Sequence, residues 1–316
     1  MKAEPKIAIV GAGMAGLACA RRLTDAGHSV ILLEKSRGLG GRLASRRTEY
    51  GPIDHGARFI KPRTSQFQEF LVRSTAKGSA APWAVRGEAK AACYVGLPSM
   101  NGLVKPLAAG IEIRLQSRVT GIARSDRGWQ LESEDGALQI GFQHVVFAVP
   151  APQAFDLLGD LRGPFTELDE ARMSPCWAYL ASFEGRLEGL DDLPEVGDRR
   201  IDWLARDSAK PGRKRSDERW ILHANAEWSR DRLDLSWEAA LAELRDVFAS
   251  AVGQAPPQPL YEAAHRWRYA LTERALGKPF VSDAGGTLFA CGDWCLGASA
   301  EDAFQSGTAV AEAILG

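Results

Sequence analysis

The fold of this protein is decided by KIAIVGAGMAG, residues 6–16 of a chain of 316 residues. Lys6 is followed by a continuous apolar run at residues 7–10, rich in β-branched side chains, which is typical of a strand buried on both faces. Leu17 to Gly27 follows with the pattern of a helix and ends on a glycine. Ser29 to Glu34 is expected to form a second strand. This order predicts a βαβ unit at the start of a parallel sheet.

Each glycine of the loop between the first strand and the helix has a mechanical role. Gly11 permits the tight turn, Gly13 lets the backbone approach a pyrophosphate, and Gly16 lets the helix pack closely on the strand. The first helical turn, around Ala15, offers backbone N–H groups to phosphates. Glu34 stands where the carboxylate of an acid accepts hydrogen bonds from the hydroxyls of an adenosine ribose, and its negative charge disfavours a 2′-phosphate. The pattern predicts a Rossmann-like dinucleotide-binding domain without separating NAD from FAD.

Two further motifs bear on that choice. SRGLGGR, residues 36–42, is a second glycine-rich loop. Gly41 has no side chain to obstruct a cofactor beside the backbone, and the Arg42 guanidinium can donate two hydrogen bonds to a pyrophosphate. Near the other end, residues 287–291 predict a strand, Gly292-Asp293 follows, and residues 300–315 predict a helix whose N-cap is Ser299. Together the three motifs resemble those of a large family of FAD-binding flavoproteins that includes the amine oxidases. This resemblance implies FAD, with the Asp293 carboxylate accepting a hydrogen bond from a hydroxyl of the ribityl chain.

The nucleotide-binding motifs lie at both ends, so the substrate region is expected as an insertion. A hairpin series is predicted over residues 119–124, 129–132 and 138–140, a strand over 144–149 and an amphipathic helix over 236–252. Pro150 and Pro152 suggest a crossing between domains. The predicted fold is α/β, with a Rossmann-like FAD-binding domain (1–60, 100–152 and 282–316) and an inserted mixed-sheet α+β substrate domain (61–99 and 153–281).

Composition and charge exclude several classes of protein. The formal net charge of -1 disfavours a nucleic-acid partner. The basic run at residues 210–215 is interpreted as a solvated loop, because Asp207, Asp217 and Glu218 flank it. Five scattered cysteines predict reduced thiols, no metal site and a cytoplasmic location. An apolar run at 7–20 imitates a signal peptide, but cleavage would remove the glycine motif, so no secretion, no membrane and no protein partner are expected.

The chain resembles the bacterial renalase-type FAD-dependent oxidoreductases of the flavin amine oxidase superfamily. The segments that carry the resemblance are KSR (35–37), GGR (40–42), Asp54 with Gly56-Ala57, Met173 with Pro175 and Trp177, DWLAR (202–206), WILHA (220–224), Trp228-Ser229, HRW (265–267) with Tyr269-Ala270, and CGDWCL (291–296). The glycine motifs occur in many flavoproteins. The tryptophan-bearing segments are narrower and separate this family from amine oxidases and desaturases.

The resemblance implies an oxidase that converts 1,2- or 1,6-dihydro isomers of NAD(P)H to NAD(P)+. A hydride passes to non-covalent FAD, and O2 reoxidises the flavin to give H2O2. Loss of hydride makes the ring aromatic, so no general base is assigned, and His265 is only a weak catalytic candidate. Most of the tryptophans are expected to pack in the core. A flavin amine oxidase and a non-catalytic flavin-binding protein stay open as alternatives.

The resemblance also implies site residues, which we state as expectations. The residues expected to bind the cofactor are Gly11, Gly13, Ala15, Gly16, Glu34, Lys35, Gly41, Arg42, Arg58, Phe59, Val119 and Asp293. The residues expected to bind substrate are Phe59, Tyr94, Cys176, Trp267 and Ser299, with Trp267 stacking on the nicotinamide ring. Cys176 and Ser299 stand where relatives are expected to carry a threonine and a basic residue, so both contacts are in doubt.

Overall fold

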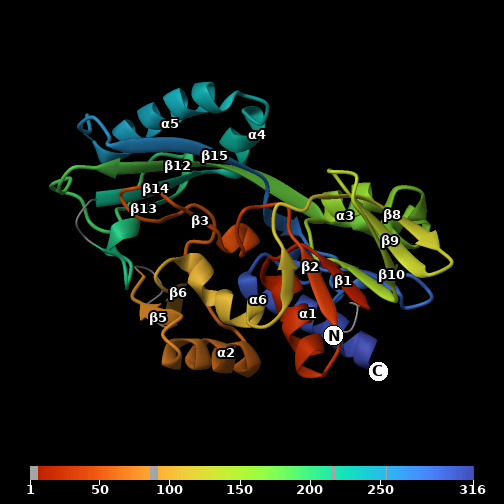
Figure 1. Ribbon diagram of the computed structural model, residues 1–316. Coiled ribbons are helices and arrows are strands. Elements are labelled where there is room, and N and C mark those ends of the chain that lie inside the picture. The colour runs from red at the N-terminus through yellow and green to blue at the C-terminus, as the bar shows by residue number, and fades with distance from the viewer. Residues whose placement is uncertain (1–5, 86–91, 215–217, 254) are drawn as a thin grey trace. The chain divides into compact units, whose positions relative to one another are not determined.

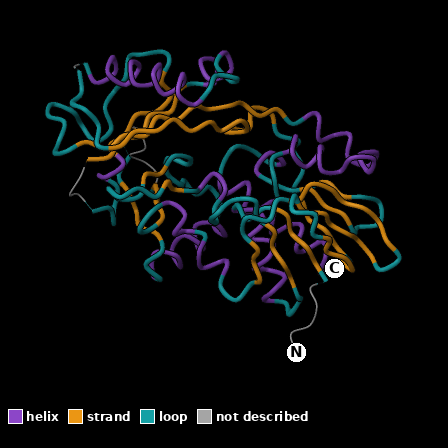
Figure 2. Tube along the Cα trace, turned by 45° about the horizontal axis from the view of Figure 1, so that its top comes forward, coloured by secondary structure: helices purple, strands orange, loops and turns teal. Residues whose placement is uncertain are grey.

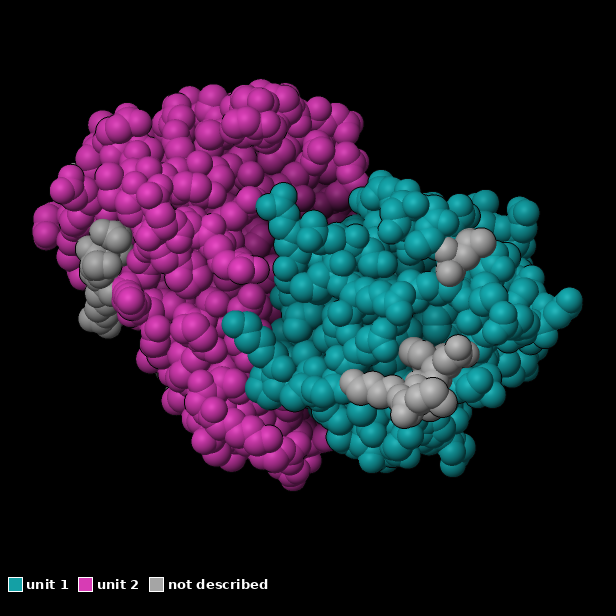
Figure 3. Space-filling view, in the orientation of Figure 1, with its two compact units in different colours: residues 1–41, 104–173, 272–316 teal, residues 42–103, 174–271 magenta. Residues whose placement is uncertain are grey.

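The computed structural model describes residues 6–85, 92–214, 218–253 and 255–316. The chain divides into two compact units, which Figure 3 colours separately: residues 1–41, 104–173 and 272–316 form the first, and residues 42–103 and 174–271 form the second. This division differs from the predicted domains. Residues 42–60 group with the second unit, and residues 153–173 group with the first.

The first unit is built on a six-stranded sheet with the order β16-β17-β11-β1-β2-β7 (Figure 1). The strands are β1 (Ile7–Val10), β2 (Val30–Leu33), β7 (Glu112–Arg114), β11 (His144–Phe147), β16 (Val281–Ser282) and β17 (Leu288–Ala290). All neighbours pair in parallel except β16 and β17. β1 is buried along its whole length between β11 and β2, as its apolar run predicts.

The predicted βαβ unit is confirmed. Helix α1 (Met14–Asp25) connects β1 to β2, and it begins three residues before the predicted start because the last part of the glycine loop already forms its first turn. Helix α6 (Ala300–Leu315) packs against α1. A side chain at Gly307 of α6 would lie 2.0 Å from the carbonyl oxygen of Ala15, so this glycine is needed for the close approach of the two helices.

The rest of the first unit contains the predicted hairpin series as an antiparallel sheet of β8 (Val119–Ser125), β9 (Gly128–Ser133) and β10 (Leu138–Phe142). The proline pair is corrected by the structure. Pro150 is the N-cap of helix α3 (Ala151–Leu158), and Pro152 lies in its first turn, where a missing N–H costs nothing. The prolines therefore start a helix, which is followed by the 3-10 helix η4 (Gly159–Glu170), and the chain leaves this unit only after Met173.

The second unit contains a four-stranded sheet with the order β13-β14-β12-β15. Its strands are β12 (Arg172–Phe183), β13 (Ile201–Arg206), β14 (Glu218–Ala224) and β15 (Tyr261–Arg274). Helix α5 (Trp237–Val252) covers one face of this sheet (Figures 1 and 2). The division between the units falls inside β12 and inside β15, because both strands are long and continuous, and no loop marks the boundary there.

Tryptophans fill the core under α5, as predicted. Trp177, Trp220 and Trp228 are buried together with Phe248 of α5, whereas Trp237 at the start of that helix is 60% exposed. The unit also contains α2 (Ser65–Ala76), α4 (Ala226–Asp231) and two small sheets, β3 (Ser45–Arg46) with β4 (Ile53–Asp54) and β5 (Ala80–Trp83) with β6 (Cys93–Gly96). In the described part of the chain, every helix is too short or too polar to span a membrane.

Candidate functional site

In the first glycine loop, the backbone geometry requires glycine at positions 11 and 16 but not at position 13. Gly11 has a φ of +105°, and a Cβ at Gly16 would lie 2.0 Å from the carbonyl oxygen of Gly11. A Cβ at Gly13 would meet nothing within 4 Å. Gly13 is also the N-cap of α1 and supplies no side-chain cap to the helix N-terminus. The loop therefore presents open space and backbone N–H groups, as a bound pyrophosphate needs.

Glu34 is held in place by the same loop. Its buried carboxylate accepts hydrogen bonds from the backbone N–H groups of Ala12 and Ser36, each at 2.8 Å. One bond goes to each oxygen, which leaves further lone pairs for ribose hydroxyls. Lys35 turns away from Glu34 to Gln153 at 3.4 Å, and burial and the nearby Arg118 lower its pKa.

The second glycine loop lies directly against the first. The backbone N–H of Gly40 donates to the carbonyl of Ala12 at 2.9 Å, and Gly13 and Gly40 form a β-bridge. Gly41 has a φ of +53°, and a Cβ there would lie 3.3 Å from the Cα of Gly13. Both predicted phosphate-side motifs thus meet at one place, and the residues present fit a dinucleotide cofactor.

The C-terminal motif lies at the end of β17. Asp293 is buried, begins the 3-10 helix η6 (Asp293–Cys295), and accepts a hydrogen bond from the Thr272 hydroxyl at 3.1 Å. Ser299 is the N-cap of α6, as predicted, and forms a capping box with Asp302. Because the Ser299 hydroxyl also donates to Asp302 at 2.6 Å, the side chain is already engaged within its own helix. Val119, the other predicted cofactor contact here, is buried at the start of β8.

In the second unit, the segment that begins with Arg42 runs along β15. The Arg42 guanidinium donates to the carbonyl of Ala270 at 3.1 Å, and the Arg42 carbonyl accepts from the N–H of Ala57 at 2.8 Å. A Cβ at Gly56 would lie 2.0 Å from the same Arg42 carbonyl oxygen. Part of the Arg42 fork is therefore used to anchor β15, which the sequence pattern did not predict.

Three aromatic side chains, His55, His265 and Trp267, form what we call the ring cluster. His55 stacks on Trp267 with centroids 5.1 Å apart, and the ring of His265 lies edge-on to both, with centroids 4.5 Å away. Burial, together with Arg46, lowers the pKa of His265 to about 4. Burial, His265 and Arg46 lower the pKa of His55 to about 3. Both imidazoles are neutral at physiological pH, and pKa values so far below that pH make them weak general bases.

Phe59 and Cys176, two more of the predicted substrate residues, lie on the same unit, as does Arg58, which was predicted to bind the cofactor. Arg58 forms an ion pair with Asp202, and its guanidinium lies 5.4 Å from the centroid of Trp203. Phe59 tilts against the same Trp203 ring at 5.8 Å. Cys176 is partly buried, and its thiol lies 3.6 Å from the carbonyl of Ala224; burial raises its pKa to about 12, so it stays a thiol.

Tyr94, the least certain of the predicted substrate residues, lies in β6. Its side chain is 8% exposed, and its hydroxyl accepts a hydrogen bond from Gln68 at 2.9 Å. Residues 86–91, which precede β6, lie outside the described part of the chain. Cys295 is a free and buried thiol, as expected.

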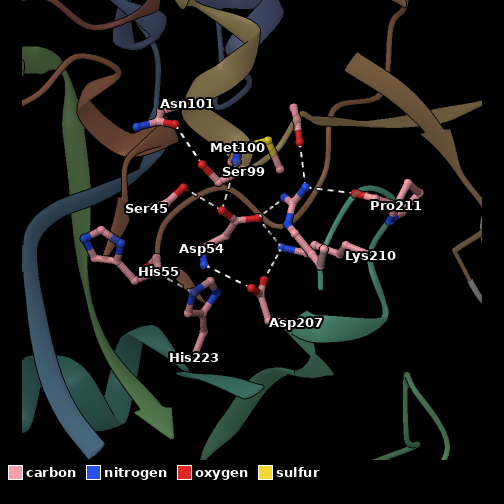
Figure 4. A network of polar contacts seen from close by, with 12 residues as sticks. Ser45, Asp54, His55, Ser99, Met100, Asn101, Asp207, Lys210, Pro211 and His223 are labelled. Carbon is pink, nitrogen blue, oxygen red and sulfur yellow. Dashed lines mark hydrogen bonds and ion pairs between the residues drawn. The ribbon is translucent and has the colours of Figure 1, made fainter. Parts of the chain in front are cut away.

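Lys210 and Arg213 of the basic run are not solvated, which corrects the sequence interpretation for these two residues, whereas Lys214 is exposed. Lys210 is 2% exposed and Arg213 is 7% exposed. Asp54, Asp207, Lys210 and Arg213 form what we call the buried charge cluster. Figure 4 labels Asp54, Asp207 and Lys210. Pairing with the two acids offsets part of the cost of burying the cations. Arg215 and Asp217 lie outside the described residues.

Asp54 is the centre of the buried charge cluster. Its carboxylate accepts from Lys210 at 3.0 Å and Arg213 at 2.5 Å, and also from the N–H of Met100 at 2.9 Å and the Ser45 hydroxyl at 2.6 Å. Burial alone would raise the pKa of Asp54, but the two cations and these hydrogen bonds hold it well below its usual range. Because His55 is the next residue, this cluster fixes the backbone that carries the ring cluster.

Comparisons with known proteins define first a class and then a family. Residues 9–73 match the NAD(P)-binding Rossmann-like domain, which agrees with the glycine-loop geometry. Residues 79–315, about three quarters of the chain, match the flavin containing amine oxidoreductase family. The chain belongs to this family. It is therefore an FAD oxidoreductase by family, and the predicted fold class and the predicted cofactor are confirmed at that level.

Individual curated relatives match only short stretches of this chain. A 15-cis-phytoene desaturase of Synechococcus elongatus is 50% identical over 46 residues, which is 15% of this chain and 10% of that protein. An L-amino-acid oxidase of Mus musculus is 50% identical over 44 residues, or 14% of this chain and 7% of that one. The matched stretches thus span about a tenth of these curated relatives.

Solved structures match over nearly the whole chain at low identity. Cyclohexylamine oxidase from Brevibacterium oxydans has a TM-score of 0.75 at 14% identity and covers 99% of both chains. An engineered putrescine oxidase has a TM-score of 0.71 at 12% identity and covers 98% of both chains. These likenesses establish the fold.

Proposed function

We propose that this protein is an FAD-dependent oxidase of dihydronicotinamide dinucleotides, oxidising 1,2- or 1,6-dihydro isomers of NAD(P)H to NAD(P)+. FAD, when bound, supplies the acceptor that takes the hydride and passes two electrons to O2, giving H2O2. Gly13, Gly41 and the N-terminus of α1 would hold its pyrophosphate, and Glu34 its ribose. We propose non-covalent binding, because Cys291 and Cys295 are buried thiols whose pKa values burial raises.

The observation that carries this proposal is the chemistry of the ring cluster. Its two imidazoles are neutral, and the charged side chains nearest to it in the described residues are cationic, chiefly Arg46. The nearest carboxylate, Asp54, is fully buried and neutralised by Lys210 and Arg213. Such surroundings suit an uncharged ring attached to phosphates. They do not suit a cationic amine, which needs an exposed acceptor.

The proposed role of the protein is positional. A dihydropyridine becomes aromatic when it loses hydride, so the step requires orientation of the ring and exclusion of competing reactions. The low pKa values of His55 and His265 agree with a reaction that needs no general base. Trp267, on the same face of β15 as His265, offers a flat surface for a planar ring.

The experiment is anaerobic mixing of the purified yellow protein with each dihydro isomer. The expected result is rapid loss of the visible absorbance of oxidised flavin, its return on admission of O2, and formation of H2O2. Ordinary 1,4-dihydro NADH serves as the matched control and should reduce the flavin much more slowly. Flavin that stays oxidised with every isomer would exclude the proposal.

A flavin amine oxidase is the second candidate. The family description and two structural neighbours, cyclohexylamine oxidase and putrescine oxidase, favour it. It predicts that cyclohexylamine, putrescine or an L-amino acid reduces the flavin with no nicotinamide present. The same anaerobic mixing experiment therefore separates the two candidates.

A further inference from the structure

The two ring nitrogens of His265 lie in different surroundings. Nδ1 lies 3.4 Å from a guanidinium nitrogen of Arg46, which is on β3. An arginine donates hydrogen bonds and accepts none, so Nδ1 must be the acceptor. Since burial and Arg46 keep the pKa of His265 at about 4, the ring is neutral at physiological pH. Its one proton is therefore on Nε2.

The Nε2–H group has no partner within the described residues, and the ring is only partly buried. It is therefore available to a ligand. By contrast, the indole N–H of Trp267 and Nε2 of His223 both bind the carbonyl oxygen of His55, at 2.8 and 3.3 Å. Nδ1 of His55 has no partner among the described residues, but this atom is buried. His265 thus supplies the unoccupied nitrogen of the ring cluster on a partly exposed ring.

Every element packed against His265 brings a donor or a neutral ring. β3 contributes Arg46, the turn after β4 contributes the neutral His55, and β15 itself contributes Trp267. The alternate residues Arg266 and Arg268 are exposed on the other face of β15. A single neutral donor beside flat rings matches an uncharged carbonyl oxygen on a planar ring. It does not match an ammonium group, which would also donate.

We propose that His265 binds the carboxamide oxygen of the substrate's nicotinamide ring through Nε2–H, and that Arg46 is the positioning residue that fixes this tautomer. The proposal rests on the proposed function and names the group of the substrate that the ring cluster recognises. His265 does not move a proton in it. Its contribution is specificity for the face and rotation of the ring.

The tautomer is tested without turnover. Protein labelled with ¹⁵N-histidine is studied by long-range ¹H–¹⁵N correlation, and His265→Gln assigns the signals by their loss. The Nε2–H pattern is expected from pH 5.5 to 8. Arg46→Met should mix the tautomers and raise the pKa of His265 only part of the way to its ordinary value, because burial, the larger cause of the lowering, remains, whereas Arg46→Lys should preserve the pattern. An Nδ1–H pattern in the unaltered protein would overturn the proposal.

The ligand is tested by titrating the FAD-loaded protein with NAD+ and following the perturbation of the flavin spectrum. His265→Phe should weaken NAD+ binding about three- to tenfold, the effect of losing one neutral hydrogen bond. His265→Gln, which keeps a donor near the Nε2 position, should restore most of the affinity. The acetylpyridine analogue retains the carbonyl and should respond as NAD+ does.

The unsubstituted pyridine analogue, which lacks the carbonyl, is the matched control. It should bind weakly and equally to the unaltered protein and to His265→Phe. An equal loss for all three dinucleotides would assign His265 a merely structural role and overturn the proposal. If the unaltered protein is reduced by a dihydro isomer while His265→Phe binds NAD+ normally, only this inference fails. If no isomer reduces the unaltered protein, the proposed function fails and this inference with it.

Discussion

The indole N–H of Trp267 donates to the carbonyl oxygen of His55 at 2.8 Å, while the two rings stack with their centroids 5.1 Å apart. One residue is on β15, and the other immediately follows β4. The same carbonyl accepts from His223 on β14. A single backbone oxygen thus connects three segments, and the side chain of Trp267 cannot rotate without losing both a stack and a hydrogen bond.

Replacing Trp267 separates these two contributions. Trp267→Phe keeps an aromatic face but leaves the His55 carbonyl with one donor, and should lower the free energy of unfolding by about 1 kcal/mol. Trp267→Leu should additionally raise the KM for a dihydro isomer roughly two- to tenfold, the range for a lost aromatic pair. Urea denaturation and steady-state kinetics measure the two effects. An unchanged KM in Trp267→Leu would show that the ring does not contact substrate.

The glycine loop provides a matched pair of variants. Gly13→Ala should leave the stability of the cofactor-free protein nearly unchanged, because its Cβ meets nothing within 4 Å and its φ of -78° suits alanine. It should weaken FAD binding about tenfold to a hundredfold, as an overpacked contact does. Gly16→Ala should destabilise the protein itself, since its Cβ would lie 2.0 Å from the Gly11 oxygen. Thermal unfolding and FAD titration distinguish the two.

The buried charge cluster should make a large contribution to stability when only one partner is removed. Lys210→Met leaves Asp54 and Asp207 with less compensation in surroundings that are 0 to 1% exposed. We expect a loss of about 3–5 kcal/mol in the free energy of unfolding, measured by urea denaturation.

An exposed pair serves as the control for that loss. The Arg200 side chain is 45% exposed and forms an ion pair with Asp198. Arg200→Ala breaks this pair and should lower the free energy of unfolding by less than about 1 kcal/mol. Similar losses for Lys210→Met and Arg200→Ala would contradict a special role for the buried cluster.

Stability should depend on pH through the histidines. The folded-state pKa values of His55 and His265, about 3 and about 4, and that of His223, well below its usual value, all lie under the unfolded value. Their stabilising contribution is therefore full above about pH 6.5 and is lost as pH falls, because the unfolded chain takes up protons first. Each should cost about 1.4 kcal/mol between pH 7.5 and 5.5, or about 4 kcal/mol together.

Urea denaturation at several pH values between 7.5 and 5.5 measures this slope. Asp54 contributes little in this range, because its two cations and its hydrogen bonds hold its pKa well below the usual value. His265→Gln removes one of the three strongly shifted sites and should reduce the slope by up to about a third, because His144, whose pKa burial also lowers, adds to the slope. A slope equal to that of the unaltered protein would mean that His265 is protonated in the folded state.

Local patterns predicted the nucleotide-binding half well, for a physical reason. In a βαβ unit the strand, the glycines and the acid are contiguous or a fixed distance apart, so Gly11, Gly16 and Glu34 identify the fold from the chain alone. The Ser299 cap is equally local. Domain boundaries were harder, because they fall inside β12 and β15, where continuous strands show no break in composition.

The second half could not be predicted in the same way. Lys210 and Arg213 look solvated in the sequence, since the partner that neutralises them, Asp54, is more than 150 residues away. His55 was missed as a member of the ring cluster for the same reason: its contacts with His265 and Trp267 cross a large sequence separation. The available signal was the pairing of a lone acid with a histidine, Asp54-His55, before a glycine.

The two amide hydrogen bonds to Glu34 have a practical consequence. Because Ala12 and Ser36 hold this carboxylate through the main chain, the nucleotide loop keeps its anchor when no flavin is present. Mild removal of the flavin should leave an apoprotein that regains full occupancy on mixing with FAD, without a slow refolding phase. Flavin analogues of altered reduction potential could then be exchanged into the protein, giving a series in which the hydride-accepting ring varies while the polypeptide stays the same.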